Sequence, residues 1–202
     1  MPVTIRKHFS ALAFAFALLA AGPARAWNAG THLYVAERLL RQQVADPRLI
    51  MAAEYGANAL DLFNNDFAPA AQVLAGWLHD PSDDLFMRVW RSPAARPTPL
   101  RAYAFGVASH NDTWGADATA HLSGLTSGQG VGWVIEKAGI LGAMLDPVLQ
   151  ANGIVLTPAQ LLDVGHVLVE QAVDLLMLQR HPELGVKLLA SAALRDPRDP
   201  AL

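Results

Sequence analysis

Residues 109–121 carry two histidines and two aspartates, in a chain that is otherwise mostly apolar. If this stretch is helical, each residue turns by about 100° around the axis. His110, Asp117 and His121 then lie on one face, whereas Asp112 points away from His110. Such a face is costly in a core unless something binds it, and imidazole and carboxylate are good metal ligands. The stretch therefore indicates a metal site or, as the alternative, a polar helix face in water.

Composition narrows the chemistry that this chain can use. Its 202 residues, 52% of them hydrophobic, suit one compact domain with a sizeable core. The net charge of −3 gives no sign of a general nucleic-acid-binding surface. The sequence contains no cysteine, so disulfides and thiolate ligands are excluded. Any metal site must be built from histidine, carboxylate and backbone groups.

Apolar residues recur at helical spacing, and no run alternates as a strand would. We therefore expect an all-α fold, a single bundle of about six or seven helices. The clearest start signal is Thr157-Pro-Ala-Gln160, with threonine as cap, proline first and glutamine third. Residues 82–99, which contain three prolines, are expected to form a loop. The expected helices are 31–45 (capped by Thr31), 49–63, 68–78, 100–121, 131–149, 158–180 and 184–194.

Residues 1–26 have the three parts of a secretory signal peptide. Arg6 and Lys7 form a basic start, residues 11–21 form a short apolar run, and Ala24-Arg25-Ala26 is a small-x-small cleavage motif. We expect cleavage there and export to the periplasm or medium; the alternative is an uncleaved N-terminal anchor. Loss of three basic residues would change the net charge from −3 to −6. Residues 27–202 would then form the mature domain.

Histidines elsewhere in the chain also come with potential ligands. Cleavage would place the free amine and carbonyl of Trp27 near His32, and together they could chelate a metal. His166 and Glu170 are four residues apart and share a helix face. Each has a simpler reading: His32 as a capping or surface residue, and His166 with Glu170 as an ordinary intrahelical pair. Asp61 and His79 also allow surface readings, as residues near helix ends.

With these residues the chain resembles the superfamily of zinc-dependent phospholipases C and S1/P1 nucleases. The Trp27 terminus with His32, the Asp61 segment and His166-x-x-x-Glu170 carry the resemblance. It implies an exported all-α protein around as many as three zinc ions, with Asp61 also acting on the attacking water. The implied ligands are Asp61, His79, His110 and a bridging aspartate for one zinc; Trp27, His32 and the same aspartate for a second; and His121, His166 and Glu170 for the third.

The bridging aspartate is where the chain departs from the family. The family places it four residues after its histidine, and that position here is Trp114. The helix-face argument favours Asp117 as the bridge, with Asp112 as the alternative.

Three functions are compatible with these residues. The first is a monomeric phospholipase C-type enzyme that cleaves phospholipids or other phosphodiesters and could contact a membrane surface. Its apolar rim would come from Phe86, Met87, Trp90 and Trp133. The second is a single-strand nuclease whose basic groove would come from Arg88, Arg91, Arg96 and Arg101. The third is a zinc-binding protein without catalysis, which would have closed four-ligand sites.

Overall fold

The computed structural model describes residues 29–63, 68–80, 84–93, 98–125 and 130–193. Within these residues the fold is all-α, as expected, and contains no strand. The predicted signal peptide and Trp27 lie outside the described residues. The elements are α2 (Ala29–Leu40), α3 (Pro47–Asn58), the 3₁₀ helix η1 (Leu60–Phe63), α4 (Pro69–Leu78), α5 (Leu85–Arg91), α6 (Thr98–His110), the π-helix η3 (Ala118–Ser123), α7 (Trp133–Ala151), α8 (Pro158–Arg180) and α9 (Leu184–Ala193).

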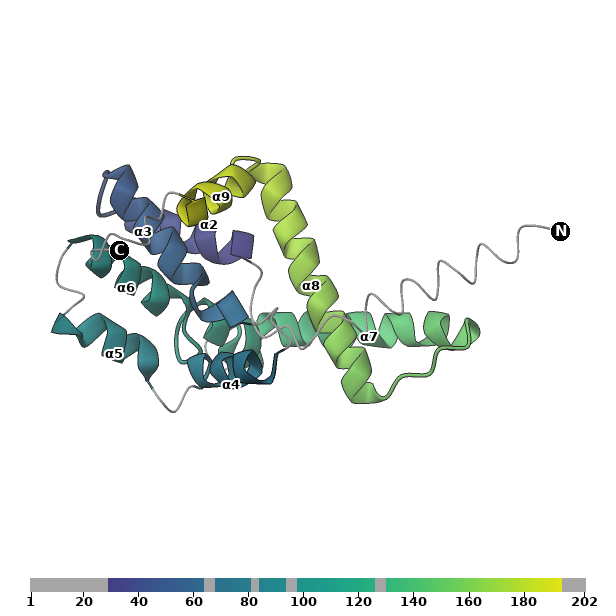
Figure 1. Ribbon diagram of the computed structural model, residues 1–202. Coiled ribbons are helices and arrows are strands. Elements are labelled where there is room, and N and C mark those ends of the chain that lie inside the picture. Colours follow the sequence, from purple (N-terminus) through teal and green to yellow (C-terminus); the bar gives the residue numbers. More distant parts are fainter. Residues whose placement is uncertain (1–28, 64–67, 81–83, 94–97, 126–129, 194–202) are drawn as a thin grey trace.

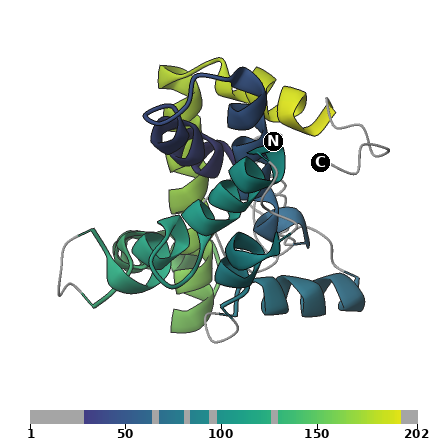
Figure 2. The ribbon, with the colours of Figure 1, turned by 90° about the vertical axis from the view of Figure 1, so that its left-hand side faces the viewer.

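Helix α3 packs against α2, α6 and α9 (Figure 1). The long helix α8 begins beside α7 and ends beside α9 (Figures 1 and 2). Helix α7 extends beyond its crossing with α8 (Figure 1). The close approach at the crossing depends on Gly165, because a Cβ there would lie 2.3 Å from the Ala138 carbonyl oxygen. Among the described helices, none combines the length and apolar character needed to cross a membrane.

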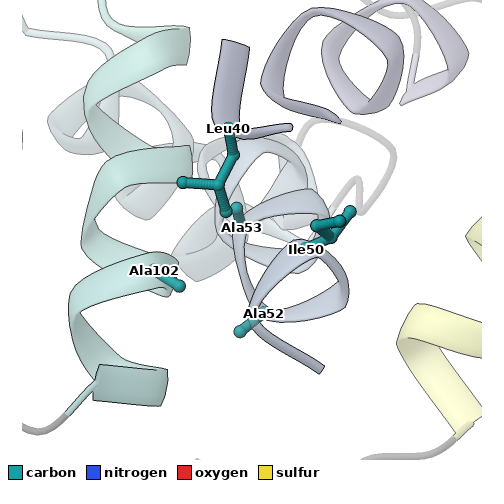
Figure 3. Packing of buried hydrophobic residues seen from close by; sticks show 5 residues of the cluster. All are labelled: Leu40, Ile50, Ala52, Ala53 and Ala102. Carbon is teal, nitrogen blue, oxygen red and sulfur yellow. The ribbon is translucent and has the colours of Figure 1, made fainter. Parts of the chain in front are cut away.

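The α3–α6 interface is built from small residues. Buried Ala52, Ala53 and Ala102 pack with Leu40 and Ile50 in one core cluster (Figure 3). At the same interface a Cβ on Gly106 would lie 2.0 Å from the Ala53 carbonyl oxygen, and one on Gly56 would lie 2.1 Å from that of Tyr103. The two backbones are therefore closer than larger side chains would allow.

The predicted start of α8 is confirmed as a capping box. The Thr157 hydroxyl accepts a hydrogen bond from the backbone N–H of Gln160, whose side chain accepts one from the backbone of Thr157. Elsewhere the bounds differ from those expected. α2 ends at Leu40 rather than near residue 45, α3 gives way to a 3₁₀ turn after Asn58, and residues 85–91 of the predicted loop form α5.

The prediction of one continuous helix over residues 100–121 is wrong. α6 ends at His110, a turn follows, and a π-helix begins at Ala118. Asn111 causes the break: its side-chain oxygen accepts the backbone N–H groups of Thr113 and Trp114, and its amide donates to the Ala108 carbonyl. These local bonds compete with the helical pattern. Gly115 completes the turn, since a Cβ there would lie 2.6 Å from the His110 carbonyl oxygen.

Candidate metal centre

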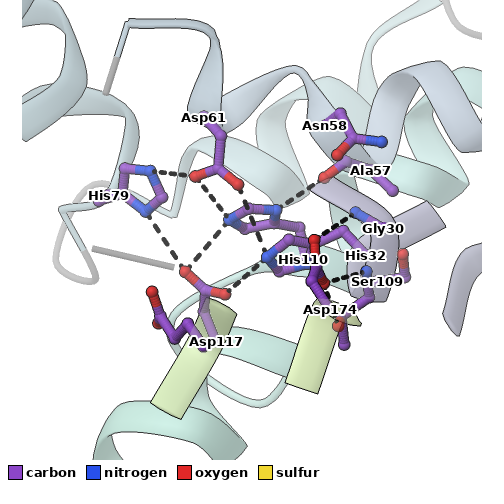
Figure 4. Close-up of polar contacts among 12 residues, drawn as sticks. Gly30, His32, Ala57, Asn58, Asp61, His79, Ser109, His110, Asp117 and Asp174 are labelled. Atoms are coloured by element: carbon purple, nitrogen blue, oxygen red, sulfur yellow. Dashed lines mark hydrogen bonds and ion pairs between the residues drawn. The ribbon is translucent and has the colours of Figure 1, made fainter. Parts of the chain in front are cut away.

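Asp117 lies at the centre of a buried group of imidazoles and carboxylates (Figure 4). Its Oδ2 lies 3.1 Å from Nε2 of His110, at the end of α6. Its Oδ1 lies 3.3 Å from Nε2 of His32, in α2. The side chain has no exposed surface, and neither carboxylate oxygen makes a hydrogen bond within the described part of the chain. The structure thus places Asp117 between His32 and His110, whereas Asp112 lies beside His79.

Asp61 faces Asp117 across the same imidazole rings (Figure 4). Its Oδ1 lies 3.3 Å from Nε2 of His79 and 3.7 Å from Nε2 of His110. Its Oδ2 lies 3.6 Å from Nε2 of His32. With 17% of its side chain exposed, Asp61 is the more accessible of the two central carboxylates. The surface reading of Asp61 is therefore wrong, because the 3₁₀ turn η1 directs it into the centre.

Two further contacts orient the histidine rings. Nδ1 of His110 donates to the carbonyl oxygen of Ala57 at 2.7 Å, which leaves Nε2 directed at Asp117 and Asp61. Nδ1 of His79 lies 3.1 Å from Oδ2 of Asp112, which leaves its Nε2 facing Asp61. Partners of this kind fix the tautomer and direction of metal-binding imidazoles. Asp112 therefore has an orienting position, a role that sequence reasoning missed.

A second group lies between the π-helix and α8. Nε2 of His121 is 3.1 Å from Nε2 of His166 and 3.1 Å from Oε1 of Glu170. Glu170 also pairs with His166 on its own helix, at 2.8 Å, and its Oε2 is buried without a hydrogen bond in the described structure. The predicted intrahelical pair is thus present, but it is completed by a histidine from another element. Single π-helical turns often occur at functional sites, and this one carries His121.

The residues fit bound metal ions. Ligand atoms of a tetrahedral ion with bonds of 2.0–2.1 Å lie about 3.3 Å apart. The nitrogen and oxygen atoms described above are separated by 2.8–3.7 Å. Nε2 of His79, Nε2 of His110 and both oxygens of Asp117 are buried without hydrogen bonds within the described residues, which is costly unless a cation binds them. Several of these side chains form groups of three whose donor atoms could hold one ion.

Burial and charge act in opposite directions on the pKa values of the two central histidines. Burial lowers the pKa of His79, but the hydrogen bond to Asp112 and the charges of Asp112 and Asp61 outweigh it and raise this pKa to about 10. Burial likewise lowers the pKa of His110, while Asp117 and Asp61 raise it to about 9. Burial raises the pKa of Asp117 above its ordinary value. Without a metal the centre therefore retains protons that an ion would have to displace.

An apolar pocket of about 330 Å³ lies beside the turn that follows α6. Met87 and Trp90 line it, together with Leu39, Phe105, Ala108, Ser109 and Trp114. Phe86 is a core residue instead, packed edge-on against Trp114. Trp133 is half-buried at the start of α7 and is not among the residues that line this pocket.

The arginines expected for a nucleic-acid groove are partly engaged elsewhere. Arg101 donates to the backbone oxygen of Trp90 and lies over its ring, 3.2 Å from the centroid. Arg91 is 3.9 Å from Asp84, and Arg88 is exposed. Arg96 lies outside the described residues, as does Trp27, so the structure does not place the expected N-terminal ligands.

Asp174, which was not among the residues predicted from the sequence, also lies at the edge of the metal centre. Asp174 of α8 accepts hydrogen bonds from the start of α2, directly before His32 (Figure 4). It follows Glu170 by four residues, so the helical spacing that links His166 to Glu170 could have found it.

Comparisons of the chain with protein-family models, with curated proteins and with solved structures find no match.

Proposed function

We propose that this protein is an exported, zinc-dependent phosphodiester hydrolase of the phospholipase C type. One observation carries the proposal: five imidazoles and three carboxylates from elements far apart in sequence converge in two adjoining groups. Asp117 links the groups, since its Oδ2 lies 4.0 Å from Nδ1 of His121. The converging residues are His32, His79, His110, His121, His166, Asp61, Asp117 and Glu170.

The donor set favours zinc over other common ions. Calcium and magnesium prefer all-oxygen sites, whereas imidazole suits zinc and related transition metals. The three sites implied by the family resemblance use these same residues, with the Trp27 amine and carbonyl completing the set at His32. When bound, zinc ions lower the pKa of a shared water and neutralise charge on the phosphodiester.

Asp61 is the residue we assign to the attacking water. It has one carboxylate oxygen toward His79 and His110 and the other toward His32, yet it is partly exposed. A carboxylate in this position can accept a hydrogen bond from a water at the centre and hold it for attack. Asp117 has no exposed surface and accordingly serves only to hold and bridge the centre.

Partial exposure of the second group supports catalysis over a purely structural role. The side chains of His121 and His166 are 12% and 13% exposed, so a substrate phosphate can approach them. A structural zinc site would be closed by four protein ligands. For the second group the described residues supply three.

The surroundings favour a phospholipid over a nucleic acid. The apolar pocket adjoins Ser109 and Trp114, which flank His110 and Asp112 in the sequence, and it offers space for an acyl chain. Arg101, in contrast, is held against Trp90, and Arg91 lies near Asp84. A single-strand nuclease would need basic side chains free to follow the backbone of the nucleic acid.

The test is a paired activity assay on purified, zinc-loaded protein. One sample receives phosphatidylcholine and the other single-stranded DNA, each with and without a chelator. We expect chelator-sensitive release of diacylglycerol and no cleavage of DNA. His166→Ala should abolish the activity. His181→Ala is the matched control, because His181 lies outside the centre, with its ring tilted against that of Tyr34.

The other outcomes identify the alternatives. Chelator-sensitive cleavage of DNA would assign the protein to the nuclease branch. Tight zinc binding without activity on either substrate would favour the non-catalytic role. N-terminal mass spectrometry of the exported protein checks the second zinc site, since a first residue other than Trp27 would remove two of its ligands.

A further inference from the structure

One imidazole and two carboxylates lie in succession along the same face of α8. His166 and Glu170 belong to the second group of the metal centre, and Asp174 comes four residues after Glu170. Residues four apart on a helix are neighbours on its surface. These three residues thus form a row that extends from the second group of the centre toward α2. Helix α2 carries His32, which lies beside Asp117.

Asp174 holds the first turn of α2 by three hydrogen bonds. Its Oδ2 accepts the backbone N–H of Gly30 at 3.2 Å, and its Oδ1 accepts the backbone N–H of Thr31 at 3.0 Å. The Thr31 hydroxyl donates to the same Oδ1 at 2.7 Å. The first N–H groups of a helix have no partner within that helix and are usually satisfied by a nearby cap residue. Here the cap comes from 143 residues away, and Thr31 is not the cap that sequence analysis expected.

The contact leaves little freedom at the start of α2. Gly30 admits Asp174 because it has no side chain, and a Cβ there would lie 3.1 Å from Oδ2 of Asp174. His32 is the next residue after Thr31, and its ring is stacked on His110 with centroids 3.9 Å apart. Any shift of this first turn would therefore move Nε2 of His32 relative to Asp117 and Asp61, which lie 3.3 and 3.6 Å away.

We propose that Asp174 is a positioning residue of the metal centre, which holds His32 in register with Asp117 and ties its ion to the α8 group. The inference rests on the proposed function in one respect, that His32 binds a metal ion. The hydrogen bonds of Asp174 go to Gly30 and Thr31 rather than to the His32 ring. Its action passes through the backbone of Gly30 and Thr31.

If Asp174 only stabilised the fold as a helix cap, its loss would have a different effect. Loss of such a cap would lower the melting temperature of the metal-free protein but leave zinc affinity unchanged in the folded protein. A positioning role requires instead that zinc affinity fall, and that the fall depend on His32. The two roles separate in a double-mutant cycle, because two residues that act through one site are not additive.

The experiment measures zinc affinity and stoichiometry by competition with a chromophoric chelator. The variants are Asp174→Ala, His32→Ala and the two combined. Asp163→Ala is the control, since Asp163 is an exposed aspartate of the same helix. We expect Asp174→Ala to weaken one equivalent of zinc by about 10–100-fold, the effect typical of residues that support metal ligands. In the His32→Ala background the same substitution should have no further effect, and Asp163→Ala should resemble the wild type.

Milder variants keep the test decisive if Asp174→Ala fails to fold. Asp174→Asn keeps an oxygen acceptor and should restore part of the affinity, and Thr31→Val removes one of the three hydrogen bonds and should cause a smaller loss. Unchanged zinc affinity in these folded variants, or an equal loss with and without His32, would overturn the inference alone. A wild-type protein that binds no zinc would overturn both the inference and the proposed function.

Discussion

His110 donates a hydrogen bond from Nδ1 to the carbonyl oxygen of Ala57, at 2.7 Å. The bond joins the end of α6 to α3 and directs Nε2 of His110 toward Asp117. It forms because Gly106 and Gly56 let the two helix backbones approach closely. The geometry of the centre is therefore coupled to the packing of the core.

Gly106→Ala tests this coupling. The new Cβ would lie 2.0 Å from the Ala53 carbonyl oxygen, so α6 must move away from α3. We expect a loss of about 1–3 kcal/mol in the free energy of unfolding, as is typical of overpacking, together with weaker zinc binding. Urea unfolding and a zinc titration measure the two effects.

The matched control is Gly139→Ala, within α7, where a Cβ meets nothing within 4 Å. It should leave zinc binding unchanged and stabilise the helix by as much as about 1 kcal/mol, because alanine favours the helical state over glycine. Equal zinc affinity in both variants would show that the α3–α6 distance does not position His110.

Zinc should stabilise the folded protein, since the centre forms only when distant elements come together. A ligand at one hundred times its dissociation constant contributes about 2.7 kcal/mol per site. Asp117→Asn should remove most of this gain, because one oxygen of Asp117 faces His110 and the other faces His32. Thermal unfolding with zinc and with a chelator gives the measurement, and an Asp117→Asn protein stabilised as strongly as the wild type would contradict the bridging position.

Asp112→Asn should weaken zinc binding without unfolding the chain. The Asp112 carboxylate accepts the Nδ1 proton of His79, and an amide is a weaker acceptor there. A loss of affinity of about 10–100-fold is expected for such a partner. Asp163→Asn, which removes the same charge from an exposed position, serves as the control in the zinc titration. A loss of equal size in the control would point to net charge rather than to orientation of His79.

Glu54 should make the stability of the metal-free protein depend on pH. Its side chain is only 2% exposed, and burial together with the charge of Glu37 raises its pKa from 4.5 to about 7. The folded state thus keeps a proton that the unfolded chain releases above about pH 4.5. Stability falls as the pH rises from there to about 7, and remains lower above it.

The variant Glu54→Gln isolates this effect from other titrating groups. Between pH 5 and pH 8 the wild type should lose about 2–3 kcal/mol more than the variant in the free energy of unfolding. Urea unfolding in the presence of a chelator provides the comparison. Parallel pH profiles for the two proteins would mean that Glu54 has an ionised partner in the folded state.

Local patterns in the sequence were enough to predict the fold class and the positions of several helix ends. The capping box at Thr157 and Gln160 depends on groups three residues apart, and it is present as predicted. The break after His110 was missed, although its cause is also local. Asn111 satisfies three backbone groups of its own turn, and helical periodicity alone does not reveal such competition.

The sequence by itself determined that the fold is all-α and that its histidines come with carboxylates, because helical periodicity and ligand chemistry can be read along the chain. Only the tertiary structure decided that Asp117 lies between His32 and His110 while Asp112 supports His79. It also brought Asp174 to the start of α2. These relationships depend on how closely helices approach and where a helix breaks, and both follow from packing between residues that the sequence keeps far apart.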